Sequence, residues 1–282
     1  MKKIIYLLSF LILESNFLYA QKFDSKYVQI TTSQVGGYTI SMMKLSRKVN
    51  HIKVKYFATN ENGVSVAERF NQWSRGKNII CYSAGGYFGG NYLPVGLCID
   101  NGKIVNNNVE KNRLDALAII YPTGAFAVSD LKQKNINIDI KNPLGLQKFK
   151  NWAQSNKASV FQTHLLCFNN DLKVSPTSSG SSINAASRRF LAVCQDKQGA
   201  IHHLILNIKE SITIYDATKV AHEYILNANS EFNKIAFMIN LEKGMQDVFE
   251  YYDGIGNLST TKYFGGGVPL ADAQNLIVYY YE

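Results

Sequence analysis

Residues 78–90 read Asn-Ile-Ile-Cys-Tyr-Ser-Ala-Gly-Gly-Tyr-Phe-Gly-Gly, and this stretch decides how the chain is interpreted. Its apolar first half predicts a buried strand that continues directly into Gly85 and Gly86. Paired glycines let a ligand approach backbone amides closely, and such amides can form an anion-binding concavity. The rings of Tyr87 and Phe88 are suited to stacking on a sugar. The alternative interpretation is a tight turn with a core aromatic.

Strand-like segments continue outward from this stretch in both directions. They alternate apolar and polar residues or form short apolar runs, and turn residues separate them. Three predicted helices are spaced among them. This mixture predicts an α+β fold, with residues 21–282 forming one domain around a mixed β-sheet. The other strand-like segments are 27–32, 38–45, 52–58, 95–100, 103–105, 114–121, 125–128, 160–168, 190–195, 201–208, 235–241, 248–252 and 275–281.

Capping signals place the three helices. Ser65 and Glu68 have the spacing of a capping box. Asn142 and Pro143 have the character of an N-cap and a first helical position. Asp216 is expected to cap the third helix. Between the second and third helices, a stretch rich in Ser, Gly and Thr at 176–186 predicts a mobile surface loop.

The first twenty residues have the pattern of a secretory signal peptide. Lys2 and Lys3 precede an apolar run, and Ala20 is a small residue at the expected cleavage point. The run is about ten residues, too short to cross a hydrocarbon core of ~30 Å as a helix. We therefore expect a secreted or periplasmic protein, in the setting of a bacterial envelope, with no membrane span.

The overall charge favours an acidic partner. The formal net charge is +9, and removing residues 1–20 lowers it by only one. An anionic glycan, a phosphate ester or a nucleic acid would suit such a chain. The basic residues are dispersed, however, so a solvated basic surface is the simpler interpretation. No nucleic-acid-binding motif is present, and we expect no nucleic-acid partner.

The four cysteines each lie within an apolar, strand-like run. Export would permit disulfides, and four cysteines allow three pairings, but buried free thiols are the alternative. Their spacing with histidine does not suggest zinc. The adjacent pair His202 and His203 should point to opposite faces of a strand, so it makes a poor metal site. We expect neither a metal nor a cofactor. The cysteines are Cys81, Cys98, Cys167 and Cys194.

Polar residues within apolar strands are the remaining candidates for chemistry. Gln162 and His164 should share one face of a strand, with Thr163 on the other. His164 could act as acid or base, although a lone strand histidine is more often structural. Arg189 offers a planar fork for phosphate or carboxylate, or else belongs to an exposed basic pair. Glu242, where a strand runs out into a loop, could serve as acid, base or ligand.

The order of these segments resembles the phosphodiester glycosidase family, whose members include the enzyme that uncovers the lysosomal mannose-phosphate tag. The family's glycine–aromatic segment is similar to residues 84–88, and its Pro-x-Gly strand and Asn-Gly-Lys turn are similar to 94–96 and 101–103. Its Gln-Thr strand matches 162–163, and its strand-opening arginine matches Arg189. The resemblance extends over roughly residues 75–281.

The chain departs from the family pattern near the expected active site. The family's Asn-Leu-Asp-Gly-Gly-Gly-Ser segment corresponds to residues 240–246, where the aspartate is Glu242 and two glycines are Lys243 and Met245. The family asparagine of the glycine–aromatic segment is Ala84. A displacement near 1 Å in such a site can cost about a hundredfold in rate.

The resemblance implies a hydrolase that cleaves a sugar-1-phosphodiester in a glycan or envelope polymer. Arg189, with the amides of Gly85 and Gly86, would hold the phosphate, and Glu242 would be the acid or base. Tyr87 would form a wall, and Asp247 is a weaker second carboxyl candidate. Asn240 and Gln162 would position the sugar. Thr163 and His164, which lie in the same predicted strand as Gln162, are further candidates for binding the substrate. Two alternatives remain open: a catalytically inactive relative that binds a glycan or phosphorylated polymer in the same cleft, and a structural envelope or interaction protein.

Overall fold

A computed structural model describes most of the chain beyond the first 27 residues. The described residues are 28–46, 52–58, 63–90, 92–133, 139–175, 185–228, 231–252, 258–259 and 264–281. The predicted signal peptide and residues 176–184 of the predicted surface loop lie outside them.

The strands form three sheets, and their described pairings are antiparallel. The seven-stranded sheet has the order β1-β2-β13-β12-β14-β10-β11, from Val28–Val35, Tyr38–Ser46, Ile201–Ile212, Ala186–Asp196, Phe232–Leu241, Leu165–Phe168 and Asp171–Leu172. A second sheet, β16-β15-β4-β17-β3, comes from Leu258–Ser259, Phe249–Tyr252, Asn78–Ser83, Leu276–Tyr281 and Ile52–Phe57. The third, β6-β5-β9-β7-β8, comes from Lys103–Asn106, Cys98–Asp100, Ser159–Thr163, Ala116–Ile120 and Phe126–Asp130.

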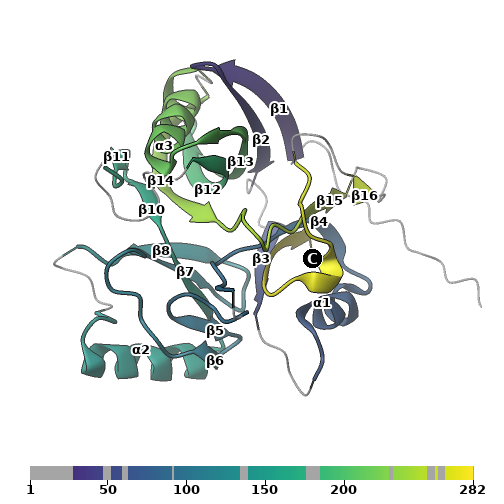
Figure 1. Cartoon of the computed structure of the whole chain (residues 1–282), viewed down its shortest axis with the longest axis vertical. Coiled ribbons are helices and arrows are strands. Elements are labelled where there is room, and N and C mark those ends of the chain that lie inside the picture. The colour runs from purple at the N-terminus through teal and green to yellow at the C-terminus, as the bar shows by residue number, and fades with distance from the viewer. Residues whose placement is uncertain are drawn as a thin grey trace, which may run out of the picture.

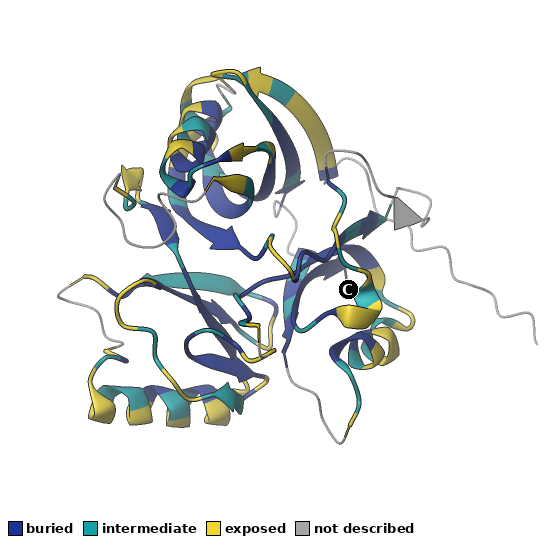
Figure 2. Ribbon diagram, in the orientation of Figure 1, coloured by how far each residue is buried: buried dark blue, intermediate teal, exposed yellow. Residues whose placement is uncertain are grey.

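A central core lies between the three sheets. Buried apolar side chains from each sheet meet there, among them Leu191, Tyr279 and Phe161. Smaller clusters fill the outer face of each sheet, where one helix covers it. Figure 1 shows α3 beside the seven-stranded sheet, α2 beneath β5 and β6, and α1 near β3 and β4. The strands are largely buried while the helices keep exposed outer faces (Figure 2).

Local capping explains where the helices begin. The predicted box between Ser65 and Glu68 is present at the start of α1, Val66–Ser74. The Asn142 side chain accepts from two backbone N–H groups at the start of α2, Pro143–Ser155. For α3, Ile214–Glu223, the predicted cap is wrong: Thr213 is the N-cap, and Asp216 donates its backbone N–H to the Thr213 hydroxyl. A threonine hydroxyl can accept a hydrogen bond from a free N–H group in the first turn of a helix, as an aspartate side chain can. A π-helical turn, Tyr224–Ala228, follows α3.

The predicted continuous strand 160–168 is two strands in different sheets. β9 ends at Thr163 in the third sheet, and β10 begins at Leu165 in the seven-stranded sheet. An unbroken apolar pattern cannot show this change of partner, because both halves are buried. His164 lies at the crossing between the two sheets. The α+β class and the three helices are confirmed.

Candidate functional site

The segments singled out by the sequence meet at one place. The Glu242 N–H donates to the carbonyl oxygen of Gly85 at 3.0 Å, and the Asn240 N–H donates to that of His164 at 3.1 Å. Arg189 in β12 lies opposite the residue that precedes Glu242 in β14. The end of β14 therefore contacts the segments that contain Gly85, His164 and Arg189, and it leads directly into Glu242.

Glu242 is buried and turned back on its own loop. Its side chain accepts from the Gly244 N–H at 2.5 Å and also from the backbone of Phe88 and Lys243. A Cβ atom on Gly244 would lie 2.8 Å from the Glu242 oxygen, so the Glu242 carboxylate packs directly against this glycine. Burial raises the pKa of Glu242 above its usual value and outweighs the hydrogen bonds that lower it. The negative charge of Asp247 raises this pKa further.

Asp247 is held between two cations beside Glu242. The Arg189 Nη1 lies 2.5 Å from one oxygen of Asp247, and the Lys243 Nζ lies 3.1 Å from the other. The Arg189 guanidinium also stacks over Phe249 at 4.6 Å and has no exposed surface. Burial lowers the pKa of Arg189, yet a guanidinium stays charged in proteins. Within the described chain, the Nε and Nη2 atoms of Arg189 have no hydrogen-bond partner.

A second polar group lies on the other side of Glu242. The Asn240 amide nitrogen donates to the Tyr87 hydroxyl, and the Tyr87 and His164 rings meet edge to face at 5.6 Å. Burial lowers the pKa of His164 and raises that of Tyr87, so both rings are neutral near pH 7. The half-buried Arg188 lies close enough for its charge to act on both rings. Among the described residues, the side-chain oxygen of Asn240 is buried without a partner.

Gln162 and Thr163 have structural partners in place of the expected sugar. The Gln162 oxygen accepts from the N–H groups of Leu97 and Glu110, and its nitrogen donates to carbonyl oxygens of the 97–114 segment. The Thr163 hydroxyl donates to the Asn240 carbonyl oxygen at 2.5 Å. Thr163 therefore holds the backbone of Asn240 in place. Gln162 holds the loop that precedes β7.

The glycine pair is explained by packing. The Gly85 N–H donates to the side chain of Asn275 at 2.8 Å, so it is not available to a phosphate. An added Cβ on Gly85 would lie 3.1 Å from Tyr56, and one on Gly86 would lie 3.2 Å from Phe161. Of the two interpretations of this segment, the close turn against core aromatics fits these contacts better than an anion-binding loop.

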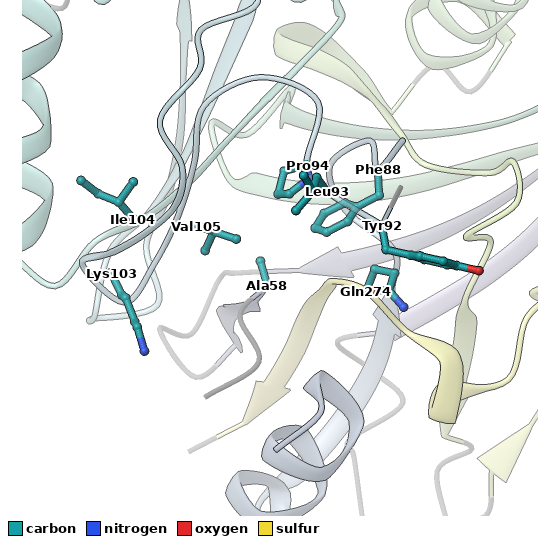
Figure 3. A pocket seen from close by; sticks show the side chains of 9 residues that line it. All are labelled: Ala58, Phe88, Tyr92, Leu93, Pro94, Lys103, Ile104, Val105 and Gln274. Atoms are coloured by element: carbon teal, nitrogen blue, oxygen red, sulfur yellow. The ribbon is translucent and has the colours of Figure 1, made fainter. Parts of the chain in front are cut away.

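Two hollows lie next to this site, and the sequence did not indicate them. One, of about 290 Å³, lies between Phe88, Leu93 and Val105, with Lys103 at its far end (Figure 3). The other, of about 490 Å³, reaches the loop that follows Glu242. The aromatic and glycine residues of 85–93 could have drawn attention to one wall of the hollows. The opposite walls come from segments that are distant in the sequence, so no local pattern reveals them.

One set of side chains among the described residues has the geometry to hold a metal ion: Asp196, His202 and Glu231, whose ligand atoms lie within 4.8 Å of one another. Each already has a protein partner. The His202 Nε2 lies 2.9 Å from Asp196, and the Lys44 Nζ lies 2.8 Å from Glu231. His203 instead contacts the Tyr279 hydroxyl at 2.8 Å, so the two neighbouring histidines do have different surroundings.

Solved structures provide the comparison with known proteins, since no family model and no curated protein matches the sequence. The catalytic domain of zebrafish N-acetylglucosamine-1-phosphodiester alpha-N-acetylglucosaminidase, auto-inhibited by its pro-peptide, superposes with a TM-score of 0.50 at 13% identity. That match covers 90% of this chain and 82% of the zebrafish chain. A hypothetical protein from Synechocystis superposes with a TM-score of 0.51 at 10% identity, covering 90% of this chain and 62% of the other.

These matches show that the fold is distantly related to that of the phosphodiester glycosidase family, which the sequence resembles. They concern the arrangement of sheets and helices alone. In the described part of the chain, no helix has the length and apolar character needed to cross a membrane.

Proposed function

We propose that this protein is an exported glycosidase-like hydrolase that cleaves a sugar-1-phosphodiester. The observation that carries the proposal is the pair of buried carboxyl groups, Glu242 and Asp247, placed beside the Asn240–Tyr87–His164 group. Hydrolysis of glycosidic bonds generally uses two carboxyl groups whose surroundings push their protonation apart. The distant fold relationship supports the same reaction class.

The two carboxyl groups would have different roles. Glu242, whose pKa is raised by burial, donates a proton to the phosphate oxygen as the bond from that oxygen to the anomeric carbon breaks. Asp247, which lies between Arg189 and Lys243, stabilises the positive charge that develops on the sugar. Water then adds its hydroxyl to the anomeric carbon and returns a proton to Glu242.

The substrate contacts differ from those expected from sequence. Arg189 has no exposed surface, so we assign it to positioning Asp247 rather than to binding phosphate. The half-buried Arg188, beside Tyr87 and His164, is the cation better placed for the phosphate. The unpartnered Asn240 oxygen remains our candidate acceptor for a sugar hydroxyl.

A binding protein without turnover is the second candidate, and one observation favours it. The Glu242 carboxylate is already occupied by backbone N–H groups, which is how a carboxylate stabilises a loop. In that case the cleft would hold a sugar phosphodiester without cleaving it.

Turnover separates the two candidates. Purified residues 21–282 would be incubated with methyl N-acetylglucosamine-1-phosphodiester, and released sugar would be measured alongside binding by calorimetry. We expect saturable release of N-acetylglucosamine. Binding without release would support the second candidate, and neither binding nor release would leave both proposals without support.

A further inference from the structure

The two hollows beside the site adjoin each other at Tyr92. Tyr92 and Gln274 line both of them, so the two hollows are neighbours, and we refer to them together as the groove. Figure 3 shows the Tyr92 ring running alongside Gln274, with Phe88 and Pro94 on the neighbouring wall. The second hollow extends to Gln246, four residues beyond Glu242. The groove therefore leads toward the proposed catalytic loop.

Tyr92 is held in an unfavourable backbone conformation with its ring in solvent. Its φ is +59°, in the left-handed region that a bulky side chain rarely adopts. Two backbone hydrogen bonds fix this turn: Tyr92 N–H to the Gly89 carbonyl and Gly89 N–H to the Leu93 carbonyl, both 2.9 Å. The side chain is 62% exposed, so burial does not compensate for the conformation. Backbone strain of this kind concentrates at ligand sites.

The walls of the groove have the mixed chemistry of a carbohydrate site. An exposed aromatic ring can stack on the apolar face of a sugar, and amide and carboxylate groups can bond its hydroxyls. Gln246, Gln274 and Asp272 supply such groups in the second hollow. The Gln274 nitrogen donates to the Asp272 carbonyl oxygen at 3.1 Å, which fixes that side chain beside Tyr92. The volumes are those of small-ligand sites rather than of a flat protein interface.

We propose that the groove on the two sides of Tyr92 binds a neutral glycan chain, with one sugar ring stacked on the Tyr92 phenol and its hydroxyls bonded to Gln246, Gln274 and Asp272. The inference rests on the proposed function in one respect: the bound chain would be the part of the substrate that extends away from Glu242. Asp272 in the second hollow disfavours phosphate there, so the anionic part of the substrate belongs on the Arg188 side.

The test is calorimetric binding of the N-acetylglucosamine trimer to residues 21–282 and five variants. We expect Tyr92→Ala to weaken binding about tenfold, since an aromatic stacking contact is of that size. Tyr92→Trp should retain binding. Tyr215→Ala, which removes a half-buried tyrosine on α3, should bind as wild type does. Glu242→Gln should also bind fully, so a failure of hydrolysis and a failure of this inference remain distinguishable.

Folding is checked with Tyr92→Gly. Glycine adopts the left-handed backbone freely, so the melting temperature of this variant should equal or exceed that of wild type, while trimer binding weakens about tenfold as in Tyr92→Ala. The inference is overturned if wild type does not bind the trimer, or if Tyr92→Ala binds it as tightly as wild type does.

Discussion

At the scale of single residues, the buried Arg189–Asp247 pair makes a testable contribution to stability. Breaking a buried ion pair costs about 3–5 kcal/mol when the remaining charge has no partner, but Asp247 also has Lys243 at 3.1 Å. We therefore expect Arg189→Met to lower the free energy of unfolding by up to about that amount in urea titrations. A loss below about 1 kcal/mol for Arg189→Met would contradict the pairing.

The raised pKa of Glu242 gives stability a defined dependence on pH. A carboxyl whose folded-state pKa exceeds its unfolded value stabilises the protein below the unfolded value near 4.5 and loses that contribution as pH rises. Glu242→Gln cannot ionise, so its stability relative to wild type should improve as pH rises from about 4.5 through the raised pKa of Glu242. Paired urea titrations across this range measure the difference. A constant difference would show that the pKa of Glu242 is not raised.

The residue types at the candidate site are easier to predict from the sequence than the partners of those residues. Glu242, Asn240 and Arg189 were identifiable because polar residues at the ends of apolar strands stand out. That Arg189 is buried against Asp247, and that Gln162 bonds the 97–114 loop, depends on contacts between distant segments. Local pattern carries no information about them.

At the scale of elements, the loop that follows β4 tests whether the glycine pair serves packing. A methyl group on Gly86 would meet Phe161 at 3.2 Å, whereas one on Gly90 would meet nothing within 4 Å. We expect Gly86→Ala to destabilise the fold by about 1–3 kcal/mol, the usual cost of overpacking, and Gly90→Ala to change it little. Thermal unfolding of the two variants gives the comparison. Equal stabilities of the two variants would contradict the packing interpretation and favour a ligand-binding role for Gly85 and Gly86.

Elements with strong local signals were predicted well. The caps at Ser65 and Asn142 come from neighbouring residues, so the sequence contains what determines them. The division of 160–168 into β9 and β10 does not: it results from a change of partner sheet at His164. That change is also what places His164 beside Tyr87, so the site depends on the feature that was hardest to predict.

At the scale of the whole molecule, the four cysteines report on the integrity of all three sheets. They are buried free thiols in β4, β5, β10 and β12, and burial raises the pKa of both Cys98 and Cys167 to about 12. A thiol reagent should therefore react with none of them in the native protein and with all four after denaturation, because reaction needs an accessible thiolate. Two or four cysteines that stay unreactive after denaturation would instead indicate disulfides.

The central claim is that three sheets bring Glu242, Asp247 and the Asn240–Tyr87–His164 group together as one catalytic site. The most direct measurement is kcat/KM for methyl N-acetylglucosamine-1-phosphodiester with wild type, Glu242→Gln and Glu223→Gln, the last being an exposed glutamate on α3. We expect Glu242→Gln to lose about a hundredfold or more, as removal of a general acid does, and Glu223→Gln to match wild type. Equal activity in the two variants would contradict the claim.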